Sequence, residues 1–251
     1  MPTRFTPARS RLFIALALAA GSVLSAGCAQ RSLVAVRESG DYNYKMGHYD
    51  AALTDYKEYV ERAPGKPEVH QMLGNTYMKL GETGLGREQL LMANAMRVED
   101  DQIFADMCAA LYTDKQYDDL NRVLRQRTVD RGRMQDWALL ATYSEKLGDR
   151  DEAQRAWLTA AKVSNGRAVD PQIGLARLYM QVGDMDRARQ RAAMAYWLEP
   201  GNPNVQILVR DVKEVPGPTL GVMPSEFSGP LPPHRQPMDG RTVVVPTAGD
   251  R

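Results

Sequence analysis

The sequence has few of the residues on which disulfide-bonded folds and metal sites depend. Its 251 residues include two cysteines, three histidines and four phenylalanines. Two cysteines cannot make a disulfide framework or a Cys-rich zinc site, and His48, His70 and His234 lie far apart in the sequence, which argues against a catalytic metal cluster. Lys and Arg number 32 against 31 Asp and Glu, so the chain has no basic excess on the scale that nucleic-acid binding needs. We therefore expect no metal, no cofactor and no nucleic-acid partner.

The first 27 residues have the pattern of an export signal. Arg4, Arg9 and Arg11 lie in an N-terminal stretch without acidic residues, and an uncharged apolar run of 13 residues follows from Leu12 to Leu24. That run is too short for a membrane-spanning helix, which needs about 20 residues. A basic segment followed by a short apolar segment is typical of a secretory signal peptide.

The signal ends in Ser25-Ala26-Gly27-Cys28, which resembles the lipobox of bacterial lipoproteins. The resemblance implies cleavage before Cys28 and acylation of that cysteine, although Ser25 stands where leucine is commonest. The alternative is an ordinary signal peptide with a chance cysteine. Attached acyl chains would anchor the protein without a transmembrane helix. Ala29, rather than Asp, follows the cysteine, and the sorting rule of enteric lipoproteins then implies the outer membrane, facing the periplasm. The mature chain would have a net charge of −2 and one remaining thiol, Cys108.

A pattern of glycine, an aromatic or similar residue, and alanine recurs along the rest of the chain. Its anchor positions are 47, 81, 115, 148 and 183, with spacings of 34, 34, 33 and 35 residues. Apolar residues fall at helical spacing on both halves of each unit, and small residues would let two helices approach closely. A period of this length predicts a solenoid whose units bury their apolar faces only by stacking.

The repeat resembles the tetratricopeptide repeat, a 34-residue helix–turn–helix. The fourth unit carries Trp137, Leu140, Ala141, Ala153 and Trp157 at the family's aromatic, leucine and small-residue positions. The third unit departs most, with Arg127 in place of a small residue, which puts the packing there in doubt. The resemblance implies an all-α, right-handed α-solenoid with repeats at residues 33–66, 67–100, 101–133, 134–168 and 169–202.

The two ends of the predicted solenoid differ from the repeats. Residues 28–32 would be the lipidated N-terminus and a short linker, and residues 203–213 a single capping helix over the last apolar face. Eight of the 15 prolines fall in residues 214–251. No apolar period survives in this segment, so we expect a disordered or polyproline-like tail. Within it, Val243–Val245 could add as a strand to a partner.

No motif in the sequence indicates catalysis. There is no Gly-rich phosphate loop and no nucleophile elbow, and Cys108 stands where the repeat places a small buried residue. The sequence therefore predicts a binding protein and not an enzyme.

The family resemblance indicates where a protein or peptide ligand would bind. The first helix of each repeat lines the concave groove of such solenoids. The side chains expected there are Arg37, Asp41, Tyr44, Lys45, Gln71, Asn75, Met78, Lys79, Ala105, Ala109, Tyr112, Ala138, Thr142, Glu145, Ile173, Arg177 and Met180. Asn75 fits one position of the family's carboxylate clamp, but Gln71 replaces the lysine, so we expect no full clamp.

Together these features favour a lipid-anchored adaptor of the bacterial cell envelope, whose oligomeric state the sequence leaves open. Lipoproteins of this build resemble pilus-assembly factors, which suggests pilus or secretion-system assembly. The alternative is an envelope regulator that docks a peptidoglycan hydrolase or a protease. A subunit of an enzyme whose catalytic site lies in a partner is a third possibility.

Overall fold

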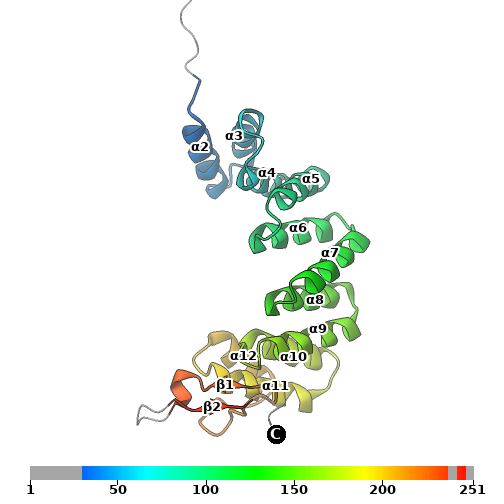
Figure 1. Ribbon diagram of the computed structural model, residues 1–251, viewed down its shortest axis with the longest axis vertical. Helices are drawn as coiled ribbons and strands as arrows, with labels where there is room; N and C mark the ends of the chain where they lie inside the picture. Colours follow the sequence, from blue (N-terminus) through cyan, green and yellow to red (C-terminus); the bar gives the residue numbers. More distant parts are fainter. Residues whose placement is uncertain (1–29, 237–241, 247–251) are drawn as a thin grey trace, which may run out of the picture. The chain divides into compact units, whose positions relative to one another are not determined.

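The computed structural model describes residues 30–236 and 242–246 of the chain. The expected signal peptide and Cys28 lie outside the described residues. Within the described part, eleven α-helices follow one another, mostly in antiparallel pairs (Figure 1). They are α2 (Leu33–Lys45), α3 (Tyr49–Arg62), α4 (Pro67–Leu80), α5 (Thr83–Met96), α6 (Asp101–Thr113), α7 (Tyr117–Asp130), α8 (Met134–Leu147), α9 (Arg150–Val163), α10 (Val169–Gln181), α11 (Met185–Leu198) and α12 (Pro203–Asp211).

The fold is an all-α helical repeat, as the sequence predicted. The first helix of each pair begins at the residue where the sequence pattern begins a repeat, at positions 33, 67, 101, 134 and 169. The chain forms two compact units, Met1–Met107 and Cys108–Arg251, whose boundary falls inside α6. We describe each unit by itself.

The turn between paired helices needs a left-handed residue at the same place in every repeat. Gly47, Gly81, Gly148 and Gly183 have φ values of 76°, 83°, 82° and 80°. Lys115 takes the corresponding place in the third repeat with φ 59°. Glycine adopts this conformation without steric penalty, whereas the Cβ of lysine opposes it. The glycines that recur in the sequence therefore mark left-handed turns that recur in the backbone.

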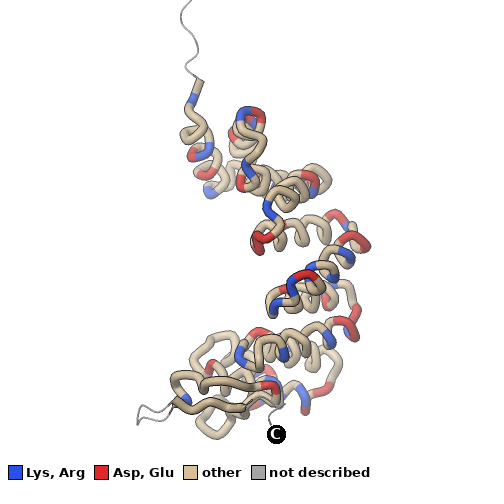
Figure 2. Tube along the Cα trace, viewed as in Figure 1, with Lys and Arg blue, Asp and Glu red and all other residues tan. Residues whose placement is uncertain are grey.

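Acidic side chains begin the second helix in two repeats. Asp149 accepts a hydrogen bond from the backbone N–H of Glu152 at 3.0 Å, and Asp184 accepts one from Arg187 at 3.1 Å. Each bond satisfies an N–H group that has no partner within the helix. The carboxylates therefore help to fix where α9 and α11 start. Figure 2 shows that charges of both signs otherwise line the helices.

Small residues lie where paired helices approach each other. A Cβ on Gly40 would lie 2.7 Å from the ring of Tyr56, and one on Gly74 would lie 2.7 Å from Leu90. Ala52 is fully buried at the same kind of crossing. These contacts confirm the expectation that small residues permit close helix packing.

Arg127, the residue that put the packing of the third repeat in doubt, is accommodated by an ion pair. Its Nε lies 3.1 Å from Asp136 Oδ1, and both side chains are almost fully buried. Arg131 and Arg133 also approach Asp136, at 3.9 and 3.4 Å. A buried guanidinium is tolerated only with such a partner. The third repeat thus joins the fourth through charge rather than through a small residue.

The prediction of a disordered tail is wrong for residues 214–236 and 242–246. Strand β1 (Gly229–Pro230) pairs antiparallel with β2 (Val244–Val245), and a short 3-10 helix, η1, spans Pro233–Arg235. The segment Val243–Val245, expected to add to a partner, therefore pairs within its own chain (Figure 1).

The reason for the order is that the tail packs on the last helix pair. The ring of Phe227 meets Trp197 edge to face at 4.9 Å, and Leu231 and Val245 pack on the same cluster. The ring of Trp197 also contacts Arg235 of the tail. A few apolar residues spaced between prolines thus suffice to fix the tail, because Trp197 offers them a partner.

Polar contacts fix the tail at two further points. Glu226 Oε1 lies 2.9 Å from Arg191 Nη1 on α11, and the backbone N–H of Ser228 donates to the carbonyl oxygen of Asn165 at 3.0 Å. Gly166, in the turn between α9 and α10, leaves room for the tail, since a Cβ there would lie 2.5 Å from the backbone nitrogen of Phe227. We call residues 214–236 and 242–246 the strap.

Candidate functional site

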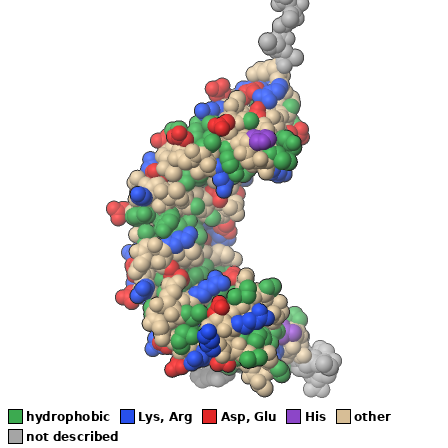
Figure 3. Space-filling view, turned by 180° about the vertical axis from the view of Figure 1, so that it is seen from behind, with side chains coloured by type: hydrophobic (Ala, Val, Ile, Leu, Met, Phe, Trp, Pro, Cys, Tyr) green, Lys and Arg blue, Asp and Glu red, His purple; other side chains and the backbone are tan. Residues whose placement is uncertain are grey.

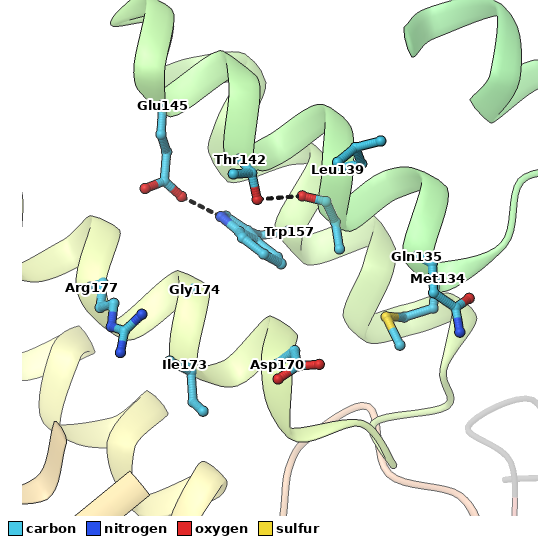
Figure 4. A pocket seen from close by; sticks show the side chains of 11 residues that line it. Met134, Gln135, Leu139, Thr142, Glu145, Trp157, Asp170, Ile173, Gly174 and Arg177 are labelled. Atoms are coloured by element: carbon cyan, nitrogen blue, oxygen red, sulfur yellow. Dashed lines mark hydrogen bonds between the residues drawn. The ribbon is translucent and has the colours of Figure 1, made fainter. Parts of the chain in front are cut away.

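A cavity of about 460 Å³ lies between the first helices of the fourth and fifth repeats. Residues of α8 and α10 form its walls, and the indole of Trp157, from α9, lies between them (Figure 4). Five of the residues expected in the groove line it: Ala138, Thr142, Glu145, Ile173 and Arg177. We call it the Trp157 cavity.

Gly174 allows the Trp157 ring to lie against α10. A Cβ on Gly174 would lie 2.4 Å from the Trp157 ring, so the indole can lie against the backbone of α10 only because that position is glycine. The indole N–H donates a hydrogen bond to the carboxylate of Glu145 (Figure 4). Thr142 donates its own hydroxyl proton to the carbonyl oxygen of Ala138 at 2.8 Å and so presents its methyl group rather than its hydroxyl. The centre of the cavity is therefore largely apolar.

Three charged side chains line the Trp157 cavity, and two of them lie toward one end. Glu145 and the exposed side chain of Arg177 lie toward one end, and Met134 and Gln135 toward the other (Figure 4). Asp170 also lines it. An apolar centre with polar groups at the margin is the usual composition of a ligand-binding cavity.

A second cavity, of about 330 Å³, lies in the first unit. Asp41, Tyr44, Lys45 and Asn75 line it, as expected, together with Tyr56 and Met72. The hydroxyl of Tyr56 donates to Asp41 at 2.8 Å, and burial together with this bond raises the pKa of Tyr56 above its ordinary value. Burial also raises the pKa of Tyr44. Both phenols are therefore neutral hydrogen-bonding groups and not bases in this cavity, which we call the Tyr44 cavity.

The two amides of α4 already have a carboxylate partner. Gln71 Nε2 and Asn75 Nδ2 both donate to Oδ2 of Asp106, at 2.7 and 2.8 Å. A side chain of the same chain thus occupies the donors that a ligand carboxylate would need. This geometry supports the expectation that the full carboxylate clamp is absent.

Other residues expected in the groove take different places. Arg37 is exposed and lies 3.7 Å from Asp41. Met78 is packed into the space beside Gly86 of α5, where a Cβ would lie 2.6 Å from its sulfur, so it fills a helix crossing. Tyr112 lies with its ring centroid 5.7 Å from that of Tyr143, and Lys146 is above both rings. Ala105, Ala109, Lys79 and Met180 line neither cavity.

The sequence pattern missed the residues that shape the Trp157 cavity. Trp157 was assigned to the core because the repeat places a packing aromatic there, yet it also forms part of the cavity. Gly174, Leu139, Met134 and Asp170 were not expected there. The sequence did contain one signal, the combination of Gly174 with Trp157. When a glycine on one helix faces a tryptophan of the preceding repeat, the ring can lie flat against the helix backbone.

Two side chains of types that often act in catalysis or metal binding are buried in the helical repeat. Cys108 is fully buried, and burial raises the pKa of its thiol to about 12. A thiol with that pKa is not a nucleophile at neutral pH. His70 is buried, with Nδ1 2.8 Å from Gln89 Oε1 and Nε2 2.8 Å from the carbonyl oxygen of Pro64.

A third cavity, of about 470 Å³, lies where α11 meets the start of the strap, and it contains none of the residues expected in the groove. On the face in Figure 3, Lys and Arg side chains are interspersed with Asp and Glu and with hydrophobic side chains. No helix in residues 30–236 or 242–246 combines the length and apolar character needed to cross a membrane.

Comparisons with known proteins agree with the geometry. Residues 139–203 match the family described as tetratricopeptide repeat. No curated protein sequence matches the chain. The solved structures that share its fold include the following three. MamA of Desulfovibrio magneticus is 16% identical, with a TM-score of 0.53, over 68% of this chain and 97% of that one. A tetratricopeptide-repeat protein of Thermus thermophilus is 22% identical, with a TM-score of 0.50, over 72% and 99%. PilF of Pseudomonas aeruginosa is 17% identical, with a TM-score of 0.52, over 72% and 82%.

At these identities the solved structures establish the fold alone. The class is an all-α helical repeat built from antiparallel helix pairs. The period, the left-handed turn residues and the family match together show that the chain carries tetratricopeptide repeats.

Proposed function

We propose that the protein is a non-catalytic scaffold that binds a partner protein or peptide through the Trp157 cavity. The observation that carries the proposal is the largely apolar cavity of about 460 Å³ between α8 and α10. A volume of that size accepts a large apolar side chain and the backbone around it. Ile173 and Trp157 supply apolar contact, and Arg177 and Asp170 supply polar groups beside it.

The partner segment should contain an aromatic or large aliphatic anchor. The edge of the Trp157 indole and the methyl group of Thr142 offer no free hydrogen-bonding group at the centre of the cavity, because the indole N–H and the threonine hydroxyl are already bonded. A polar anchor would lose its hydration there without compensation. Arg177, which is exposed, is suited to pair with an acidic residue of the ligand.

Selection from a random peptide library displayed on phage tests this proposal. We expect the purified protein to enrich peptides with an aromatic or large aliphatic anchor next to an acidic residue. Ala138→Trp would fill the cavity and lower the affinity of a selected peptide about a hundredfold or more. Ala95→Trp, at an exposed position of α5 away from both cavities, is the matched control and should bind as the wild type does. Equal binding by Ala138→Trp would refute the site, provided that its melting temperature is unchanged.

We further propose that the scaffold is held on the bacterial envelope by acyl chains on Cys28, at the periplasmic face of the outer membrane. The support is the basic segment, the 13-residue apolar run and the Ser-Ala-Gly-Cys sequence that follows it. Only residues 29–32 separate this cysteine from α2, a span of about 15 Å at most. A scaffold so close to the bilayer suits the assembly of a pilus or a secretion system.

Metabolic labelling tests the anchor separately from the cavity. Cells given a palmitate analogue should label the wild type and not Cys28→Ala, and the label should fractionate with the outer membrane. Label on Cys28→Ala would exclude the anchor, while the peptide-binding result would stand.

A further inference from the structure

The first repeat has an uncovered stacking face. In the later repeats the first helix packs between two neighbours: α4 on α3 and α5, α8 on α7 and α9, and α10 on α9 and α11. Helix α2 packs mainly on α3. At the other end of the array α12 covers the last pair, with Val205, Leu208 and Val209 buried. The described repeats are therefore closed at the C-terminal end and open at α2.

One repeat position makes the difference measurable. The tenth residue of the first helix is Thr76, Ala110, Tyr143 and Leu178 in the second to fifth repeats, and these residues are at most 5% exposed. In the first repeat it is Tyr42, which is 61% exposed. Met46, one helical turn further, is 55% exposed. A tyrosine and a methionine of the first repeat are thus exposed to solvent on a face that the later repeats bury.

We propose that a second copy of this chain covers the face, by antiparallel pairing of α2 with the α2 of its partner about a two-fold axis near Tyr42. On a helix of 3.6 residues per turn, Ala35, Glu38, Tyr42, Lys45 and Met46 lie on one face. The two-fold axis would bring Tyr42 against its own copy and cover Met46 on the same face.

Charge complementarity favours a second copy over other occupants. Glu38 and Lys45 lie on the same side of the face, four residues before and three residues after Tyr42. Antiparallel pairing about that centre therefore brings Glu38 of each copy to Lys45 of the other. Both side chains are exposed, and neither has an ion-pair partner among the residues that the structure describes. A bilayer would leave this carboxylate without a partner.

The pairing should be weak in solution and strong on a membrane. One helix face is smaller than the roughly 800 Å² per partner of a standard interface, so contacts alone give modest affinity. Anchoring both copies to one surface raises their effective concentration without any new contact. This part of the inference rests on the proposed anchor at Cys28, whereas the pairing itself does not.

Disulfide cross-linking of the full chain in isolated membranes tests the pairing. Tyr42→Cys lies at the axis and should give a dimer of twice the chain mass on mild oxidation. Val129→Cys, which is 80% exposed on α7, is the control and should stay monomeric. A Tyr42→Cys protein that cross-links no more than the control, or only to a different protein, would overturn the proposal.

Charge exchange in the Tyr42→Cys background separates pairing from chance collision. Glu38→Lys and Lys45→Glu should each lower the cross-linked fraction about tenfold, because each sets like charges against each other. The double variant should return to within about twofold of the starting level, since it exchanges the signs. Lys45 also lines the Tyr44 cavity, but loss of a cavity contact cannot be rescued at Glu38. Unchanged cross-linking in the single variants, or no recovery in the double, would refute the two-fold arrangement. Adding Cys28→Ala should lower the cross-linked fraction. An unchanged fraction would refute the contribution of the membrane anchor but not the pairing itself.

Discussion

At the scale of single residues, the repeat is a set of steric requirements rather than a set of preferred side chains. Four of the five turn residues are glycines with φ near 80°, and the fifth, Lys115, has φ 59°. Gly174 and Gly40 are required for a different reason, because an aromatic ring occupies the space where a Cβ would be. The same residue type thus serves backbone conformation in the turns and close packing in the helices.

Replacing Lys115 by glycine should stabilise the protein. The left-handed conformation costs a residue with a Cβ about 1 kcal/mol relative to glycine, so Lys115→Gly should raise the free energy of unfolding by about that amount. Urea unfolding followed by circular dichroism measures the change. Arg125→Gly, at an exposed helical position of the same repeat, should have the opposite sign and lose about 1 kcal/mol. A destabilised Lys115→Gly would show that the lysine side chain has a role that its conformation does not reveal.

At the scale of helices, the contact between α9 and α10 joins stability to the candidate site. Trp157 contacts the backbone of α10 at Gly174, lines the Trp157 cavity and donates to Glu145. A change in how these two helices pack therefore changes the cavity as well.

Gly174→Ala should weaken both properties together. The added methyl group would overlap the indole, and relief of such overpacking typically costs about 1–3 kcal/mol of stability. The displaced ring should also lower the affinity of a selected peptide. Urea unfolding and fluorescence titration measure the two effects. Gly84→Ala in α5 meets open space and should be neutral or slightly stabilising, with no effect on binding. Loss of stability without loss of affinity would separate Trp157 from the site.

The sequence predicted the helices better than it predicted the site, for a physical reason. Helix boundaries follow from local rules, such as the turn glycines and the capping carboxylates Asp149 and Asp184, which depend on neighbours in the chain. The cavities depend on which side chains meet across repeats. Met78 packs beside Gly86, and Asn75 donates a hydrogen bond to Asp106. The position of a residue in the repeat does not by itself predict either contact.

The strap shows the same limit in another form. Its proline content predicted disorder, and the prediction failed because Phe227 and Glu226 have partners on α11. Composition describes what a segment can bury within itself, and the strap is ordered by what it buries against another part of the chain.

At the scale of the whole molecule, the two ends of the repeat array differ in how their outer helices are covered. The C-terminal end has a capping helix and the strap, whereas the face of α2 is open. A partner at the first repeat therefore meets an exposed helix face that carries Tyr42 and Met46 beside charged residues, whereas the strap covers part of the last helix pair.

The attachment of the strap should depend on pH through Glu226. Burial opposes ionisation of this carboxyl group, but hydrogen bonds from Arg191 and from the backbone outweigh it and hold the pKa below its ordinary value of 4.5. A folded-state pKa that is lowered contributes stability above the ordinary pKa, and that contribution is lost as the pH falls through the folded value.

Glu226→Gln should therefore loosen the strap at neutral pH and matter little in acid. We expect faster hydrogen exchange at Phe227 and Ser228 in the variant at about pH 7, and a difference that shrinks as the pH falls through the lowered pKa of Glu226. Glu214→Gln, whose carboxylate lies 3.7 Å from Arg189 and is 40% exposed, is the control and should change exchange at these two amides little. A difference between Glu226→Gln and the wild type that persists in acid would mean that the glutamate acts through its shape rather than its charge.

The path of the strap also sets how the protein would respond to a pulling force. The chain enters the β1–β2 pair at Gly229 and leaves it opposite, at Val245, so tension applied at the C-terminal side opens this pair from one end. Contacts that open one after another yield at lower force than contacts that are loaded together. We therefore expect tension at the C-terminal side to extend the strap before it unfolds a helix pair.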